Sequence, residues 1–222
     1  MPQLKLYNYF RSSTSYRVRI ALACKNLKYE YIPIHLLNNG GEQNSAAYRS
    51  LNPMGGVPTL EHDGKLISQS FAIIEYIDEV FKTSPSLLPA DPFLKAKVRQ
   101  ACEIINADTH PLHNLKVLAY LENTYGANEE NKQHWMNRWI VDGLTAFTKT
   151  IQPYAGQYCF GDKITAADLF LVPQMVTAVR FKVDISQFLL LKEIYDRCLQ
   201  IEAFNSAHPF RQPDTPADLQ VK

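Results

Sequence analysis

The sequence predicts a two-domain protein in which a small α/β domain precedes an all-α domain. Strand-like and helix-like hydrophobic patterns alternate through residues 1–83, as they do in α/β domains. Residues 84–92 are rich in proline and have the composition of a linker. After this linker the strand pattern disappears and only helical periodicity remains, so residues 93–222 are expected to form the all-α domain.

The expected elements of the first domain follow from short apolar runs separated by turn signals. Leu4 and Leu6 alternate with polar neighbours, which predicts a strand, and Asp63-Gly64 is typical of a hairpin turn between two further strands. The predicted strands are 3–9, 29–34, 59–61 and 65–67, and the predicted helical segments are 15–25, 46–51 and 71–80.

A proline stands directly before the third predicted strand, in the segment Asn52-Pro53-Met54-Gly55-Gly56-Val57-Pro58. Proline has no backbone N–H, so within a sheet it is admissible only at the first position of a strand or on an edge. Only X-Pro bonds adopt the cis form at modest cost, which makes the Val57–Pro58 bond a candidate for it.

In the second domain, helical periodicity covers 93–125, 129–151, 165–179 and 189–202. Thr165, followed three residues later by Asp168, fits the capping box loosely, with aspartate in place of the usual glutamate. This pair indicates a helix start and is a structural feature, not a binding site.

Composition excludes several classes of function. The chain has 222 residues and 46% hydrophobic content, enough for a sizeable core, and its net charge of +1 gives no electrostatic case for binding nucleic acid or an anionic membrane. No apolar stretch approaches the roughly 20 residues that cross a bilayer, and the N-terminus lacks a signal-peptide pattern, so a cytoplasmic location is expected. The four cysteines are widely separated and form no C-x-x-C motif, so no metal is expected.

Residues 10–17 place three serines and a threonine, flanked by two arginines, where the first predicted helix begins. The first backbone N–H groups of a helix have no partners within it, and the helix dipole adds partial positive charge there. A thiolate, phosphate or carboxylate would therefore be stabilised at Ser12 to Ser15. The alternative is a plain N-cap, in which one serine accepts a hydrogen bond from a nearby backbone N–H.

A second helix start with polar side chains lies at Gln69-Ser70, just before the predicted helix 71–80. Two helix N-termini and a proline-anchored loop suit an extended ligand that carries more than one anionic group. An ordinary helix cap is again the alternative for Gln69 and Ser70.

Six segments resemble a known family. They are SSTSYRVRIAL from Ser12, NPMGGVPTL from Asn52, SQSFAIIEYI from Ser68, TAADLFLVPQ from Thr165, RFKVD from Arg180 and HPFRQPDTP from His208. Over nearly its whole length the chain resembles the cytosolic glutathione transferases, and within them the zeta class, which includes the maleylacetoacetate isomerases. The resemblance implies a thioredoxin-like, glutathione-binding domain over 1–83 and an all-helical substrate and dimer domain over 93–222.

One position departs from the zeta pattern, which is usually S-S-C-x-W-R-V-R-I-A-L. Here Thr14 replaces the cysteine and Tyr16 replaces the tryptophan. The similar maleylpyruvate isomerases also carry threonine at that place. Losing the cysteine costs little if the attacking sulfur belongs to glutathione.

The resemblance implies glutathione as the cofactor and assigns residues to it. Ser12 would donate a hydrogen bond to the glutathione sulfur, with Ser13 and Thr14 close by, at a helix start that lowers the pKa of the thiol. The remaining assignments are Gln43 near the glycine end, Val57 and a cis Pro58 beside the cysteinyl moiety, and Gln69 and Ser70 at the γ-glutamyl carboxylate.

The implied substrates, maleylacetoacetate and maleylpyruvate, carry two carboxylates and call for cations, and a guanidinium is the usual bidentate partner of a carboxylate. Arg11 and Arg180 are the candidates, with a surface ion pair as the alternative for each. His110 falls where many zeta enzymes carry glutamine, and Asn114 lies one turn further on, so both are assigned to glutathione binding. His110 could donate hydrogen bonds or act as an acid or base near neutral pH, or it could be a packing histidine.

The activity implied by the resemblance is glutathione-dependent cis-trans isomerisation of maleylacetoacetate to fumarylacetoacetate, a step of tyrosine and phenylalanine breakdown. Maleylpyruvate is the rival substrate. A general transferase or peroxidase acting on haloacids or hydroperoxides is a second class of function, and a non-catalytic interaction module is a third. The expected partners are a small dicarboxylic enone and a second copy of the chain, in a homodimer.

Overall fold

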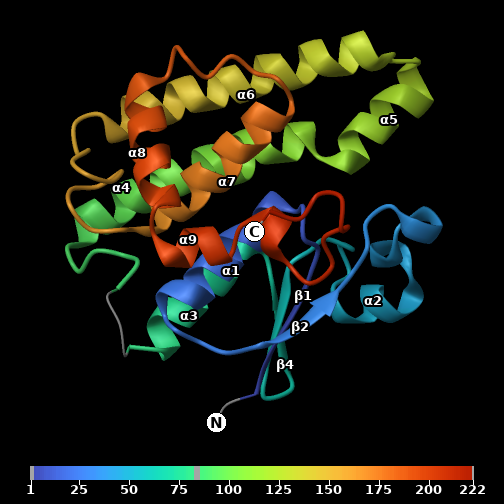
Figure 1. Ribbon diagram of the computed structural model, residues 1–222, viewed down its shortest axis with the longest axis horizontal. Coiled ribbons are helices and arrows are strands. Elements are labelled where there is room, and N and C mark those ends of the chain that lie inside the picture. Colours follow the sequence, from blue (N-terminus) through green and yellow to red (C-terminus); the bar gives the residue numbers. More distant parts are fainter. Residues whose placement is uncertain (1–2, 83–85, 222) are drawn as a thin grey trace. The chain divides into compact units, whose positions relative to one another are not determined.

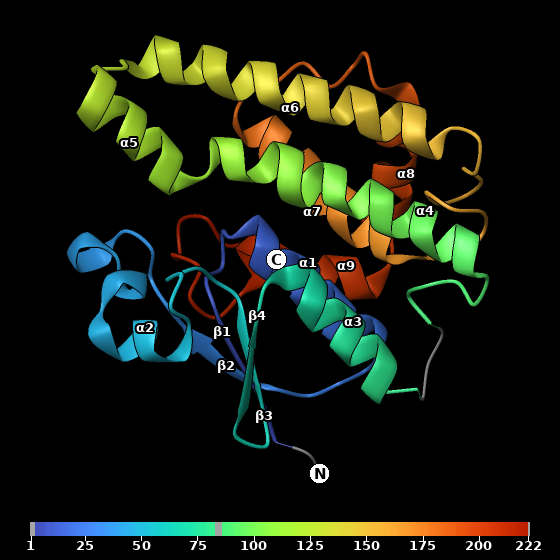
Figure 2. The ribbon, with the colours of Figure 1, turned by 180° about the vertical axis from the view of Figure 1, so that it is seen from behind.

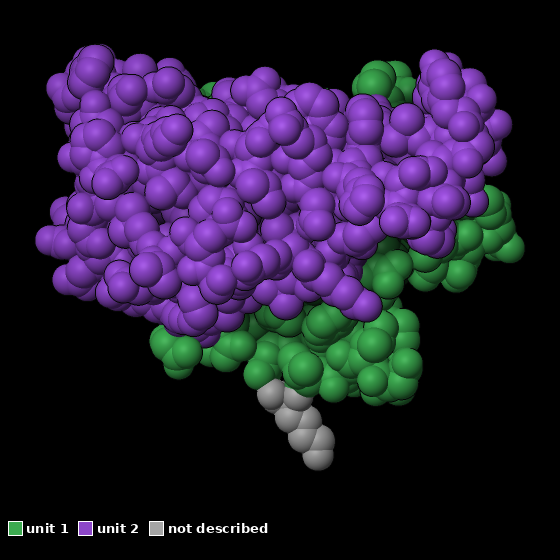
Figure 3. Space-filling view, turned by 90° about the horizontal axis from the view of Figure 1, so that it is seen from above, with its two compact units in different colours: residues 1–86, 200–222 green, residues 87–199 purple. Residues whose placement is uncertain are grey.

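The computed structural model describes residues 3–82 and 86–221. The chain forms two compact units (Figure 3). The first comprises residues 1–86 together with 200–222, and the second comprises residues 87–199.

A four-stranded mixed sheet lies at the centre of the first unit, in the strand order β2-β1-β3-β4 (Figure 1). The strands are Leu4–Asn8 (β1), Glu30–Pro33 (β2), Thr59–His62 (β3) and Lys65–Ser68 (β4). β1 pairs parallel with β2 and antiparallel with β3, so that Leu6 stands between Tyr31 and Leu60. The four predicted strands are confirmed.

The helices of the first unit are Ser13–Cys24 (α1), Ala46–Leu51 (α2) and Ser70–Val80 (α3). α1 and α3 pack against each other, and their apolar residues Val18, Ile20, Ile73 and Ile77 are fully buried. A buried ion pair of 2.8 Å between Lys25 and Asp78 joins the end of α1 to α3. α1 begins two residues earlier than expected because Ser12, not a later serine, is its N-cap.

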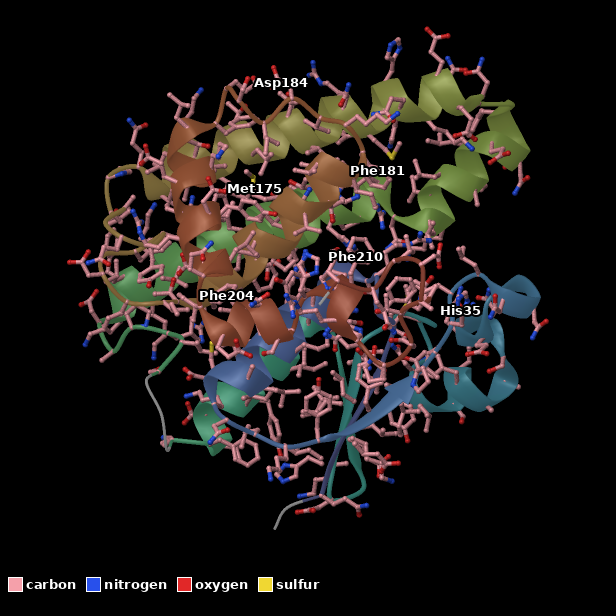
Figure 4. All side chains as sticks on the ribbon, viewed as in Figure 1. His35, Met175, Phe181, Asp184, Phe204 and Phe210 are labelled. Carbon is pink, nitrogen blue, oxygen red and sulfur yellow. The ribbon has the colours of Figure 1, made fainter. Side chains whose placement is uncertain are left out.

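The last residues of the chain belong to the first unit, which differs from the expected division at residue 93. Here the tail, residues 200–222, contains helix α9 (Glu202–Ser206), and Figure 4 labels two of its aromatic residues, Phe204 and Phe210. The hydroxyl of Tyr16 donates to the Phe204 carbonyl over 2.8 Å. The buried guanidinium of Arg19 donates to the Ala207 carbonyl over 3.0 Å. These bonds, made by α1, explain why the tail groups with the first unit.

The second unit is all-helical, as expected. Its helices are Pro92–Glu103 (α4), Leu115–Tyr125 (α5), Glu129–Ile151 (α6), Ala166–Arg180 (α7) and Leu189–Leu199 (α8). α7 packs against α4 and α8, and α4 also contacts α6, as seen from behind in Figure 2. The capping box of Thr165 and Asp168 is confirmed at the start of α7, where the Asp168 carboxylate also accepts from the backbone N–H of Cys159.

The prediction of one continuous helix over 93–125 is wrong. α4 passes into a π-helical segment (Ile104–Thr109) and a 3₁₀ segment (His110–His113) before α5 begins. Pro111 has no backbone N–H to donate to the preceding turn, which disfavours a return to α-helix within the 3₁₀ segment. Gly143 of α6 packs so closely here that an added Cβ would lie 2.0 Å from the Thr109 hydroxyl.

The predicted linker 84–92 is partly an ordered piece of the second unit. Its first residues lie outside the described part of the chain. Leu87 and Leu88 are buried, the Leu87 carbonyl accepts from the backbone N–H of Ala166 over 2.8 Å, and α4 begins at Pro92. Composition indicated a linker because prolines dominate the segment, but the two leucines between them join the core.

Over the residues that the structure describes, no helix has both the length and the apolar character needed to cross a membrane.

Candidate functional site

A chain of hydroxyl groups lies at the start of α1. The backbone N–H of Ser15 donates to the hydroxyl of Ser12 over 3.2 Å, which makes Ser12 the N-cap. The Ser12 hydroxyl lies 2.8 Å from that of Thr14. The Thr14 hydroxyl donates to the carbonyl of Val57 over 2.8 Å. Ser13 is the first residue of α1 and is half-buried.

The Val57–Pro58 bond is cis, as the sequence indicated. Two hydrogen bonds fix the loop before this bond. The carbonyl of Gly56 accepts from the Tyr48 hydroxyl and from the Asn52 side chain, each over 2.7 Å. The backbone of Val57 is thereby held in place next to the start of α1, with which it shares the Thr14 hydrogen bond. A peptide-like ligand could pair with this backbone as an added strand.

The start of α3 is a second helix N-terminus with polar side chains. Gln69, its N-cap, has a φ of 75°, a left-handed conformation that is uncommon for residues other than glycine and clusters at ligand sites. The hydroxyl of Ser70 is buried and accepts from the guanidinium of Arg17 over 3.2 Å. The N-terminal N–H groups of α3 and the buried positive charge behind Ser70 together favour a bound carboxylate.

Arg17 is a site residue to which the sequence assigned no role. It lies in α1 and its side chain is fully buried, whereas arginines are mostly exposed. The signal available in the sequence was the charge at the helix start, and it did not show which arginine turns inward.

Gln43 lies in a short 3₁₀ segment (Glu42–Asn44) near the loop that leads to the cis bond. An added Cβ on Gly55 would stand 2.9 Å from the Gln43 carbonyl. The side-chain nitrogen of Gln43 donates to the Leu36 carbonyl over 3.2 Å, whereas its buried oxygen has no hydrogen-bond partner among the described residues. That oxygen can accept an N–H from a ligand.

Arg11 is half-buried and directly precedes Ser12, with its guanidinium 5.8 Å from the centre of the Phe10 ring. Hydrogen bonds of Thr14 and Arg17, both residues of α1, therefore connect the Ser12 and Thr14 hydroxyls with the Val57 backbone and with the start of α3. This arrangement can hold a thiolate at the start of α1 and a carboxylate at the start of α3.

The three other predicted residues lie in the second unit. His110 begins the 3₁₀ segment, and its ring centre is 5.4 Å from that of the buried His113. Asn114 is the N-cap of α5, accepting from the backbone N–H of Lys116 over 3.3 Å, so the plain capping role is present. Arg180 ends α7 with an exposed side chain whose guanidinium is 4.4 Å from the centre of the Phe181 ring.

No group of three His, Cys, Asp or Glu residues within 3–82 and 86–221 is placed to hold a metal ion.

The chain is similar to known proteins over most of its length. The sequence models of the glutathione S-transferase N-terminal and C-terminal domains match residues 2–79 and 109–206. A maleylacetoacetate isomerase of Rattus norvegicus is 46% identical over 97% of both chains.

Two solved structures are also similar. One is a bacterial maleyl pyruvate isomerase described as a zeta-class glutathione S-transferase, with a TM-score of 0.91, 41% identity, and coverage of 96% of this chain and 100% of that one. The other is a maleylacetoacetate isomerase of Anaeromyxobacter dehalogenans with dicarboxyethyl glutathione and citrate bound in its active site. Its TM-score is 0.86 and its identity 38%, and the match covers 97% of this chain and 98% of that one.

Proposed function

The chain belongs to the glutathione S-transferase family, and from this premise we propose that it catalyses the glutathione-dependent cis-trans isomerisation of maleylacetoacetate to fumarylacetoacetate. The observation that carries the proposal is the joined site of the first unit. A hydroxyl cluster at the start of α1 is hydrogen-bonded to the backbone beside the cis Pro58, and a buried arginine supports the start of α3.

In the proposed reaction the sulfur of glutathione lies at the start of α1. A thiol with a pKa near 8.5 is only partly ionised at neutral pH, and the helix N-terminus together with a hydroxyl donor lowers that pKa. Ser12 supplies the hydroxyl, and Ser13 and Thr14 flank it. The Val57 backbone next to Pro58 pairs with the cysteinyl moiety, Gln43 lies toward the glycine end, and Gln69 and Ser70 hold the γ-glutamyl carboxylate.

The thiolate adds to one carbon of the cis double bond, and the electron pair of that bond moves into the conjugated carbonyl. The former double bond is now single and rotates. When the electron pair returns, the trans double bond forms and the carbon–sulfur bond breaks, which releases the thiolate. Glutathione is therefore unchanged at the end of each turnover.

The substrate carries two carboxylates, and we assign Arg11 and Arg180 to them because guanidinium groups bind carboxylates with two parallel hydrogen bonds. His110 and Asn114 are assigned to the same reaction as hydrogen-bonding groups. The dicarboxyethyl glutathione bound to the Anaeromyxobacter relative supports this class of substrate, because that compound joins a dicarboxylic carbon chain to glutathione.

A second candidate is the isomerisation of maleylpyruvate, favoured by the likeness to the bacterial maleyl pyruvate isomerase structure. The chemistry is the same, and the two substrates differ in the group beyond the double bond. A conjugating transferase would use the same thiolate but keep the carbon–sulfur bond.

The deciding experiment follows the turnover of maleylacetoacetate and maleylpyruvate with and without glutathione, while free thiol is measured. We expect product to form only with glutathione and the thiol concentration to stay constant. Thiol that disappears in step with product would show a conjugating transferase instead. The substrate with the higher kcat/KM shows whether the protein is a maleylacetoacetate isomerase or a maleylpyruvate isomerase.

The proposal includes a cytoplasmic homodimer. Two-fold pairs are the commonest soluble assembly, and helices of the second unit expose large apolar side chains, among them Phe93, Leu115 and Tyr120. Sedimentation at micromolar concentration is expected to show twice the chain mass, and a single species of 25.3 kDa would contradict the dimer.

A further inference from the structure

The direction of each hydrogen bond at the start of α1 follows from counting protons. A carbonyl oxygen only accepts, so the single hydroxyl proton of Thr14 is given to Val57. Between Ser12 and Thr14, 2.8 Å apart, the donor must then be Ser12. The Ser12 oxygen in turn accepts from the backbone N–H of Ser15. The chain of donors runs from Ser15 through Ser12 and Thr14 to Val57.

This series of hydrogen bonds leaves Ser12 with no second proton to donate. A hydroxyl carries one proton, and that proton is directed to Thr14. Ser12 is also the hydroxyl to which the proposed function assigns the hydrogen bond to the glutathione sulfur. To make that bond, Ser12 must turn its O–H away from Thr14, while its oxygen stays in place as the cap that accepts from Ser15.

We propose that Thr14 is a positioning residue that competes with the sulfur of bound glutathione for the hydroxyl proton of Ser12. The proposal rests on the proposed function, because it requires glutathione at the start of α1. Thr14 is well suited to this part because its own proton is held by the Val57 carbonyl, which turns the lone pairs of its oxygen toward Ser12. The hydroxyl is therefore an acceptor that is already in position before the ligand arrives.

The size of the effect follows from the strength of one neutral hydrogen bond, which corresponds to about twofold to tenfold in an equilibrium constant. Removing the competing acceptor would favour the thiolate over the thiol by that factor. The thiol pKa of bound glutathione would therefore fall by about 0.3 to 1 unit. Loss of Thr14 would therefore increase the ionisation of the glutathione thiol. Loss of a residue that donates directly to the sulfur would decrease it.

The test is a titration of glutathione bound to the whole protein, read by the ultraviolet absorbance of the thiolate. Four proteins are compared with the unchanged chain: Thr14→Val and Thr14→Ala, which lack the hydroxyl, Thr14→Ser, which keeps it, and Ser12→Ala. We expect the thiol pKa to fall in the valine and alanine variants, to stay unchanged in the serine variant, and to rise in Ser12→Ala. A pKa that rises or stays constant in both variants lacking the hydroxyl would overturn the proposal.

A double variant shows whether Thr14 acts through Ser12. In the Ser12→Ala background, Thr14→Val should cause no further change in the thiol pKa, because no proton remains to compete for. An equal fall with and without Ser12 would overturn the proposed competition. If the unchanged protein gives no thiolate signal, the proposed function itself fails. A thiolate signal whose pKa is the same in the Thr14 variants contradicts only the proposed competition between Thr14 and the sulfur.

Discussion

The carboxylate of Asp214 accepts a hydrogen bond from the backbone N–H of Phe10 over 3.0 Å, although 204 positions separate the two residues in the sequence. The other oxygen of Asp214 accepts from the hydroxyl of Tyr31 on β2. Burial raises the pKa of Tyr31, as does its bond to Asp214, so the hydroxyl remains a donor at neutral pH. The tail thus holds the loop that carries Arg11 and Ser12.

Replacing this carboxylate should destabilise the first unit. Asp214→Ala removes two hydrogen bonds to a charged group, and we expect the free energy of unfolding to fall by about 1.5 to 3 kcal/mol, measured by urea denaturation. Asp218→Ala is the matched control, because Asp218 is an exposed residue of the same tail. Equal stability of the two variants would mean that Asp214 does not hold the loop.

Substituting Ser12 should impair both ionisation of glutathione and turnover. Loss of a hydroxyl donor to a thiolate is expected to raise the thiol pKa of bound glutathione and to lower kcat by about tenfold to a hundredfold. Ser12→Ala also removes a helix cap, so Asn128→Ala, which removes the cap of α6, controls for a general loss of stability. Normal kcat in Ser12→Ala would exclude the assigned role.

Arg180 is predicted to recognise a substrate carboxylate. Arg180→Ala should lower kcat/KM for the dicarboxylic substrate by about tenfold to a hundredfold, because charge-assisted hydrogen bonds contribute about 1.5 to 3 kcal/mol. Arg180→Lys keeps the charge but loses the bidentate geometry, so its kcat/KM should lie between those of the unchanged protein and of Arg180→Ala. An uncharged aryl halide should be affected far less.

Arg138→Ala is the control for this prediction, since Arg138 is an exposed arginine of the same unit, paired with Asp142. If Arg180→Ala reduced activity toward charged and uncharged substrates equally and also lowered Tm, the arginine would have a structural part only.

His208 should make the stability of the protein depend on pH. Burial lowers the pKa of its imidazole below the ordinary 6.5, and the charges of Arg211 and Arg19 lower it further. The ring nitrogen Nδ1 also accepts from the backbone N–H of Phe210 over 3.2 Å, which requires that nitrogen to be unprotonated. Below about pH 6.5 the unfolded chain binds more protons than the folded one, so the free energy of unfolding falls as the pH falls.

His208→Asn keeps an acceptor for Phe210 and removes the titration. We expect its free energy of unfolding to decline less than that of the unchanged protein between about pH 7 and pH 5, as followed by denaturant unfolding. The exposed His134, changed to Asn, should leave the slope unaltered. Identical slopes for all three proteins would show that His208 does not contribute.

Gly143 should resist a substitution that usually stabilises helices. Alanine is favoured over glycine by about 1 kcal/mol within a helix, but here its Cβ would lie 2.0 Å from the Thr109 hydroxyl. We expect Gly143→Ala to destabilise the protein by about 1 to 3 kcal/mol in thermal or urea unfolding. Adding Thr109→Ala removes the nearest atoms and should restore part of the loss, and no recovery would mean that the clash lies elsewhere.

The sequence predicted the elements whose signals are local. The Asp63-Gly64 turn, the Thr165 capping box and the proline beside Val57 each depend on neighbours in the chain, and each is present in the structure. The break in the α-helix after Glu103 was missed, since the helical periodicity continues through Pro111 and hides the change of helix type.

The parts that could not be predicted depend on distant partners. The burial of Arg17 follows from the position of Ser70 on another helix, 53 residues away in the chain. The link between Thr14 and Val57 likewise requires the loop with the cis bond to return to the start of α1. Residue types at the site could be named from the sequence, whereas the direction of their hydrogen bonds could not.

The grouping of the tail with the first unit affects the order in which the protein is made. Domains usually fold from the N-terminus onward during synthesis. Here the acceptor for the buried Arg19, the Ala207 carbonyl, and the acceptor for Phe10, the Asp214 carboxylate, leave the ribosome after the whole second unit. The nascent first unit therefore lacks both of these hydrogen-bond acceptors until the second unit has been synthesised.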